Sequence, residues 1–346
     1  MKPVLALLAA AVAGAGGAGC GGEPGAAPGE RRTALWSEFL DDAAVRAALP
    51  FLAGERADLY LALPRARIGD PALAALLREA VAADVGVRAW LLVDRADGYW
   101  PTEGNAPAVR AAVMAFADWR DAEALPVDWV IFDMEMSLQR TEEVAAVTAA
   151  MGSLAGLAKI KEGRDPAAFA AHRQEYDALV RDVQARGLKV MCVTYPTVLD
   201  DGVDGDDDIQ DEMDVPVVGL PWDEASFMVY QSLIADLSGS WHGADVVLSY
   251  GQTARELFPG RAALALGIVG SAGITPVTNP YPDAPTLAAD VSAARAAGLE
   301  RVSLYSLDGI LEQPAPGDWV DDALGPVTPP PVDAEQLRGL IRGLLD

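Results

Sequence analysis

The sequence of 346 residues predicts a single α/β domain of the (β/α)8 barrel class, the TIM barrel. Eight short apolar segments, rich in β-branched and aromatic residues, alternate with segments whose apolar residues recur at helical spacing. Several helical segments end in a glycine just before the next strand, as at Gly86, Gly187 and Gly298, which is typical of a helix stop. A doubly wound open sheet is the alternative. It is disfavoured because no Gly-rich turn of the G-x-G-x-x-G kind follows the first strand.

The predicted elements follow one another along the chain. The strand candidates are residues 34–39, 57–63, 87–93, 128–133, 188–194, 226–231, 263–269 and 301–306. The helical segments are residues 71–84, 107–117, 141–161, 166–186, 243–257 and 285–297. The Pro-rich residues 314–331 predict a surface excursion before a short final helix, residues 334–345.

Composition excludes several classes of function. The net charge of −25, without any cluster of Lys or Arg, argues against nucleic acid and anionic surfaces as partners. Two histidines and two cysteines are too few for the zinc and iron–sulfur sites that these residues build, so no metal or cofactor is expected. Cys192 lies in an apolar run and is expected to be a buried structural thiol.

The first residues have the features of a targeting segment. Lys2 precedes an apolar run, and small residues lead to Cys20. This arrangement resembles the bacterial lipobox, which implies a signal peptide at residues 1–19 and a lipid-anchored, extracytoplasmic protein of the cell envelope. Residues 20–32 then form a flexible tether and residues 33–346 the barrel. Gly17 stands where that motif usually has Leu, so simple secretion is the alternative.

The stretch from Val127 to Met136, VDWVIFDMEM, closes the fourth strand candidate with two acids. Asp133 and Glu135 are two residues apart, and side chains alternate between the faces of a strand, so both carboxylates point the same way. Functional groups of such barrels lie at the carboxyl ends of the strands. A carboxylic acid beside a second carboxylate has a raised pKa, which suits a general acid. A structural role, such as capping the next helix or pairing with Arg140, is the alternative.

The spacing of three acids matches a known signature. Asp128, Asp133 and Glu135 stand at offsets −7, −2 and 0, which resembles the D-x-x-D-x-D-x-E motif of glycoside hydrolase family 18. The position at −4, also an acid in that family, is Ile131. Segments similar to the family's sixth and eighth strands contain four more candidates: Tyr230, Gln231, Tyr305 and Asp308. The family has Asp where Gln231 stands and usually Trp where Tyr305 stands.

The resemblance implies substrate-assisted, retaining hydrolysis of a glycan that contains N-acetylhexosamine, an exception to the two-carboxylate rule. Glu135 would protonate the glycosidic oxygen, and Asp133 would position and stabilise the N-acetyl group as it attacks the anomeric carbon. Tyr230 would hydrogen-bond the acetamido carbonyl. The other matched residues are expected to bind substrate: Asp128, Gln231, Tyr305 and Asp308.

Other interpretations stay open. Ile131 and Gln231 favour a catalytically inactive, glycan-binding protein on the same barrel, since each replaces an acid of the family. A lysozyme-like barrel with a D-x-E strand is possible, as is a barrel whose D-x-E has another role. A two-carboxylate glycosidase is disfavoured, because its nucleophile commonly ends the seventh strand and residues 264–271 contain no acid.

Aromatic residues lie close to the ends of several strand candidates. Aromatic faces stack on sugar rings, so together these residues favour a carbohydrate-binding rim, although each alone is as expected where a core meets solvent. The candidates are Trp36, Tyr99, Trp100, Tyr195, Trp222 and Tyr305.

Residues 200–214 hold nine acids in fifteen positions. This density of like charge predicts a solvated, mobile loop, and Ca²⁺ binding through its oxygens is the alternative.

Overall fold

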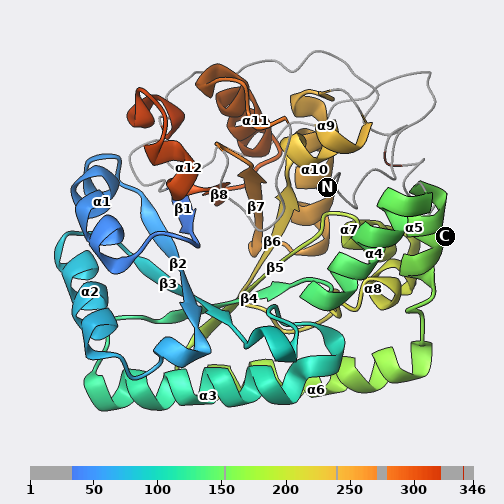
Figure 1. Cartoon of the computed structure of the whole chain (residues 1–346), viewed down its shortest axis with the longest axis horizontal. Coiled ribbons are helices and arrows are strands. Elements are labelled where there is room, and N and C mark those ends of the chain that lie inside the picture. The colour runs from blue at the N-terminus through green and yellow to red at the C-terminus, as the bar shows by residue number, and fades with distance from the viewer. Residues whose placement is uncertain (1–32, 152, 239–240, 271–278, 321–337, 339–346) are drawn as a thin grey trace.

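A computed structural model describes residues 33–151, 153–238, 241–270, 279–320 and 338. Its centre is a closed barrel of eight parallel strands in sequence order, with β1 paired to both β2 and β8 (Figure 1). The strands are β1 (Ala34–Ser37), β2 (Asp58–Pro64), β3 (Val87–Leu92), β4 (Trp129–Met134), β5 (Lys189–Thr194), β6 (Glu224–Val229), β7 (Ala262–Gly267) and β8 (Val302–Tyr305). The predicted (β/α)8 barrel is confirmed, and each observed strand lies within a few residues of a predicted one.

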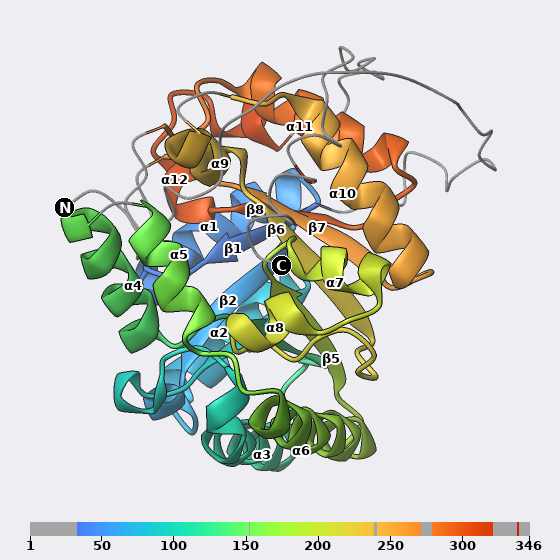
Figure 2. The same cartoon turned by 90° about the vertical axis from the view of Figure 1, so that its right-hand side faces the viewer.

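Helices surround the strands on the outside of the barrel. In both views α3 lies beside α6, and α10 lies beside α11 (Figures 1 and 2). The helices are α1 (Asp42–Gly54), α2 (Pro71–Ala82), α3 (Ala106–Glu123), α4 (Leu138–Met151), α5 (Ser153–Lys161), α6 (Pro166–Ala185), α7 (Val198–Asp204), α8 (Asp208–Glu212), α9 (Gln231–Ser238), α10 (Ala244–Leu257), α11 (Ala284–Ala296) and α12 (Leu307–Leu311). Short 3₁₀ turns add Arg65–Arg67, Arg95–Asp97, Glu103–Asn105 and Pro316–Trp319.

Aspartates begin several of these helices. Asp70 precedes the proline at the first position of α2 and accepts a hydrogen bond of 2.8 Å from the backbone N–H of Ala72. Asp165 and Asp283 likewise accept hydrogen bonds from backbone N–H groups in the first turns of α6 and α11. Each of these helices also has a proline at its first or second position. Helix α1 is absent from the predicted elements because Pro50 lies inside it, and proline reads as a helix breaker.

The barrel has two separate cores. Side chains that point outward from the strands pack against the helices and form an outer core. Side chains that point inward fill the barrel and form an inner core, as the period-two alternation of a strand requires. The inner core is aromatic on one side: the Trp36 ring meets Tyr60 and Trp90 edge to face, at centroid distances of 4.9 and 5.2 Å.

A buried ion pair closes the amino-terminal end of the barrel. The guanidinium of Arg88 lies 4.0 Å from the Trp129 ring centroid and 5.0 Å from that of Tyr60. Its Nη1 is 2.9 Å from Oε1 of Glu224, whose side chain is fully buried. Arg301 approaches the other oxygen of Glu224 at 3.4 Å. These charges, with Arg88 in register with Tyr60, form the barrel floor.

The acidic segment 200–214 is not a solvated loop, so that prediction is wrong. It forms α7 and α8, and Asp200, Asp201, Asp211 and Glu212 are buried. Asp201 accepts hydrogen bonds from the backbone N–H groups of Ile209 and Gln210, and so fixes the start of α8. Charge density alone could not show that these carboxylates have local donors.

Arg338 binds the same acidic segment. Its Nη2 is 2.6 Å from Oδ1 of Asp200, its Nη1 donates to Oγ1 of Thr253 at 2.7 Å, and its guanidinium lies 4.4 Å from the Tyr250 ring centroid. Both members of the ion pair are buried. Arg338 therefore connects α7 to α10 through a desolvated ion pair.

Several expectations concern residues outside the described ranges. The signal segment, Cys20, the tether, residues 321–331 of the Pro-rich segment and nearly all of the final helix lie there. Within the described part of the chain, no helix is long and apolar enough to cross a membrane.

Candidate active site at the carboxyl ends of the strands

Six polar side chains meet at the carboxyl end of the barrel. Each lies within one residue of the end of a strand, at inward spacing from an inner-core residue, as Asp133 and Glu135 are from Ile131. We call this set the rim cluster: Glu38, Asp133, Glu135, Tyr195, Tyr230 and Tyr305.

Asp133 and Glu135 form a coupled pair. Burial, then the neighbouring charges of Glu135 and Glu38, raise the pKa of Asp133 well above its ordinary value. Burial also raises the pKa of Glu135, to about 7, against the lowering effect of a hydrogen bond from Tyr195. The two carboxyl groups act on each other: Glu135 raises the pKa of Asp133, and Asp133 lowers that of Glu135. The pair therefore holds a proton near neutral pH.

The surroundings fix the position of this pair. The backbone N–H of Glu135 donates to the carbonyl of Pro101 at 3.1 Å. Oδ1 of Asp133 and Nε1 of Trp90 are buried without a well-formed hydrogen bond to a described residue, although the Trp90 indole is near enough to lower the pKa of Asp133. Buried polar atoms without partners are uncommon and mark places where a ligand can supply the missing hydrogen bond. Arg140 pairs with Asp214 instead of with either acid, which argues against the structural alternative.

Tyrosines border the pair on two sides. The hydroxyl of Tyr195 lies at Glu135 and also accepts a bond of 3.3 Å from the backbone N–H of Met136. The ring of Tyr230 stacks on Tyr305 at a centroid distance of 5.8 Å. Burial, followed by the charges of Asp133 and Glu135, raises the pKa of Tyr230 well above its ordinary value, so its hydroxyl stays protonated.

Glu38 is a site residue that the sequence analysis missed. It follows β1, and its two oxygens accept hydrogen bonds from Tyr99, at 2.8 Å, and from Tyr305, at 2.5 Å. Burial raises its pKa. A signal was present, since Glu38 lies two residues beyond Trp36 in the strand candidate 34–39, at the spacing that placed Asp133 and Glu135 together.

Two predicted substrate-binding residues lie at the wrong end of the barrel. Asp128 immediately precedes β4 and is exposed at the amino-terminal end. Trp222 precedes β6, packs in the outer core against Phe132, and donates from Nε1 to the carbonyl of Val217. Both predictions are corrected, because each residue stands before its strand and not after it.

The other predicted residues lie near the rim with different degrees of access. Trp36 is 2% exposed in the inner core, and its Nε1 donates to Oγ of Ser303. Gln231 is fully buried and donates to the carbonyl of Gly243, so it does not line an open surface. Asp308 accepts from the backbone N–H of Phe39 at 2.9 Å. Tyr99 is partly exposed and meets the buried Trp100 edge to face.

Cys192 and His172 lie outside the rim cluster. In the described ranges, no group of three or more His, Cys, Asp or Glu side chains could hold a metal ion. Cys192 is buried, and burial raises the pKa of its thiol, as expected for a structural cysteine. His172 contacts Glu103 at 3.2 Å, away from the rim cluster.

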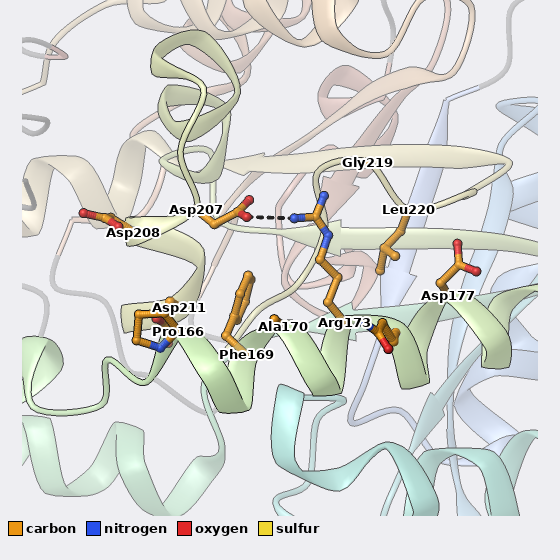
Figure 3. Close-up of a pocket in the computed structure, with 11 residues that line it drawn as sticks. Pro166, Phe169, Ala170, Arg173, Asp177, Asp207, Asp208, Asp211, Gly219 and Leu220 are labelled. Atoms are coloured by element: carbon orange, nitrogen blue, oxygen red, sulfur yellow. Dashed lines mark hydrogen bonds and ion pairs between the residues drawn. The ribbon is translucent and has the colours of Figure 1, made fainter.

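A cavity of about 410 Å³ lies outside the barrel, between α6 and α8 (Figure 3). Arg173 crosses it, bound to Asp207 at 2.8 Å and to the carbonyl of Val218, with Phe169 at its wall. None of the rim cluster lines it. Arg173 and Asp207 pair with each other, and Asp177 and Asp208 pair with arginines outside the cavity lining, so the candidate site remains at the strand ends.

The raised pKa values predict a pH-dependent stability. The unfolded chain releases the proton of Glu135 near pH 4, whereas the folded chain keeps it to about pH 7. The folded state is therefore favoured below pH 4, and this contribution is lost as pH rises through 7. Glu135→Gln removes the penalty, so we expect it to stabilise the fold at pH 8 by about 1–3 kcal/mol more than at pH 4.

Urea unfolding of both proteins at the two pH values measures this difference. Glu79→Gln, at an exposed position of α2, is the matched control and should show none. A stabilisation that does not change with pH would contradict the assigned pKa.

Comparison with known proteins shows no family. The chain matches no protein-family model and no curated protein sequence. Solved structures with a similar fold include a D-allulose 3-epimerase from Methylomonas sp. (13% identity, TM-score 0.44, covering 91% of this chain and 97% of that one). They also include an endo-β-1,4-mannanase from Thermotoga petrophila (10%, 0.49, 91% and 77%) and an exo-β-1,4-mannosidase from Opitutaceae bacterium strain TAV5 (11%, 0.48, 90% and 59%). These structures include an epimerase and two glycoside hydrolases.

Proposed function

We propose that the protein is a glycoside hydrolase that acts on a glycan containing N-acetylhexosamine. The observation that carries this proposal is the Asp133–Glu135 pair at the carboxyl end of the barrel. Its proton is held near neutral pH, and the pKa of Glu135, about 7, suits a general acid that works at that pH.

In the proposed mechanism, each residue of the pair has a different step. Glu135 donates its proton to the glycosidic oxygen as the bond to the anomeric carbon breaks. Asp133, with one oxygen toward Glu135 and Oδ1 without a well-formed hydrogen bond, accepts the N–H of the substrate's acetamido group, whose carbonyl oxygen attacks the anomeric carbon. Tyr230 stays protonated and donates to that carbonyl oxygen. As Glu135 loses its proton to the glycosidic oxygen, the proton of Asp133 passes to Glu135, and the Asp133 carboxylate so formed stabilises the positive charge that develops on the substrate.

The second candidate function is glycan binding without catalysis, and it is favoured by Ile131, which stands where the family has an acid. Ile131 is fully buried in the inner core, where it cannot share a proton with Asp133. Glu135 takes over that hydrogen bond. Catalysis is therefore the first proposal, and binding alone is the second.

The sequence adds where the protein would act. We propose that Cys20 carries a lipid that anchors it to the cell envelope, on the extracytoplasmic side, and secretion without the lipid is the alternative. Membrane contact would be through this anchor only, and the partner is a carbohydrate.

Matched substrates test the proposed function. The protein should release the aglycone from 4-methylumbelliferyl N-acetyl-β-glucosaminide or its chito-oligosaccharides, with retention of configuration. Release from the matched glucosides should be at least ~10³-fold slower, because they lack the attacking acetamido group. Equal rates on both would contradict assistance by the substrate. Binding of chito-oligosaccharides without turnover would support the second candidate instead.

A further inference from the structure

Glu38 is the one carboxyl group of the rim cluster to which the proposed mechanism gives no role. It lies across the barrel mouth from β4, after β1, which pairs with β2 and β8. Both of its oxygens are engaged by tyrosine hydroxyls, one from the segment after β3 and one from β8. Two donors on one carboxylate are the arrangement that fixes a charge in place.

The two tyrosines also connect Glu38 to the rest of the candidate site. Tyr305 is stacked on Tyr230, and both rings belong to the inner core that contains Ile131, the residue two before Asp133 on β4. Through Tyr305, the Glu38 carboxylate is therefore joined to the core from which Asp133 projects. Its charge acts on both Asp133 and Glu135 in the same direction as burial does. A fixed negative charge at a half-buried site weakens the ionisation of other acids nearby.

We propose that Glu38 is a positioning residue of this site, and that Tyr99 and Tyr305 hold its negative charge where it keeps the Asp133–Glu135 pair protonated. The proposal deepens the proposed function and depends on it for its catalytic meaning. The titratable and charged groups that act on Glu38 or on the pair are Tyr99, Tyr305, Asp308, Arg95, Tyr195 and Tyr230.

Opposing effects act on the pKa of Glu38 itself. Burial and Asp308 raise its pKa, while the two tyrosine hydroxyls and Arg95 lower it. The tyrosine hydroxyls therefore stabilise the ionised form of Glu38 against the effect of burial, although its pKa stays above the ordinary value. Tyr305 stays protonated because burial and this same charge raise its pKa well above the ordinary value.

The test is a titration of the pair in the whole protein. Carboxyl groups labelled with ¹³C are followed by NMR from pH 4 to 9, in wild type, Glu38→Gln, Glu38→Asp and the control Glu79→Gln. Resonances are assigned with Asp133→Asn and Glu135→Gln. We expect Glu38→Gln to lower the midpoints of the pair by about one pH unit, and Glu38→Asp, which keeps the charge, to restore most of the shift. Glu79→Gln should titrate as wild type.

The basic limb of the pH profile of kcat/KM should move by the same amount if the protein is a hydrolase. Unchanged midpoints in Glu38→Gln would overturn the proposal. A midpoint shift in Glu38→Asp as large as in Glu38→Gln would also overturn it, because it would show that the shape of the side chain and not its charge matters. The titration needs no substrate. Absence of turnover therefore overturns the proposed function alone, while absence of a shift overturns the role of Glu38 alone.

Discussion

Glu135→Gln is expected to lower kcat/KM for chito-oligosaccharides by about 10³-fold, because the amide cannot protonate the glycosidic oxygen. The size of the loss should depend on the leaving group. A 2,4-dinitrophenolate departs without a proton, so the same variant should lose much less activity on the 2,4-dinitrophenyl N-acetylglucosaminide. The pH dependence near 7 should disappear on that substrate, since the pKa of about 7 belongs to Glu135.

Asp133→Asn is the matched comparison, because it changes the neighbouring residue of the same strand face. An acid that orients and stabilises the acetamido group is needed for every leaving group, so the loss should be similar on both substrates. Equal sensitivity of Glu135→Gln to the two substrates would contradict its role as the acid. A larger dependence on the leaving group in Asp133→Asn would exchange the two roles.

Arg338→Met is expected to lower the free energy of unfolding by about 3–5 kcal/mol, the cost of leaving one member of a buried ion pair uncompensated. Asp200 is fully buried beneath the Arg338 guanidinium, which donates to it at 2.6 Å. Urea unfolding of wild type and variant measures the change.

A second variant separates the ion pair from packing. Asp200→Leu together with Arg338→Met removes both charges and keeps apolar volume, so much of the stability should return. Arg181→Met, whose ion pair with Asp177 is exposed on α6, should change stability by less than about 1 kcal/mol. A loss in Arg338→Met as small as in Arg181→Met would show that the buried pair adds little.

The barrel and its strands could be predicted because their signals are local. Alternation along β4 places Ile131, Asp133 and Glu135 on one face, and the order of strands follows once eight of them alternate with helices. Helix starts are equally local, as at Asp70 before Pro71. The same reasoning brings Asp133 and Glu135 to the rim without knowledge of any distant contact.

What the sequence could not reveal depends on partners far along the chain. Glu38 becomes a site residue through Tyr305, and Asp200 becomes buried through Arg338. Trp222 shows the converse error: a tryptophan near a strand was expected at the rim, but its place before β6 puts it at the opposite end. Direction along the strand, which the sequence does give, should have outweighed residue type.

The closed floor of the barrel restricts the routes by which a ligand can enter and leave the site. Arg88, which contacts Trp129 and Tyr60 and pairs with Glu224, lies at the end opposite the rim cluster, and the inner core fills the barrel between the two ends. Whatever binds at the mouth must therefore leave by the route it entered. A product still in place excludes the next ligand, so turnover would be governed by departure as well as by bond breaking, and the residues that border the mouth would set both rates.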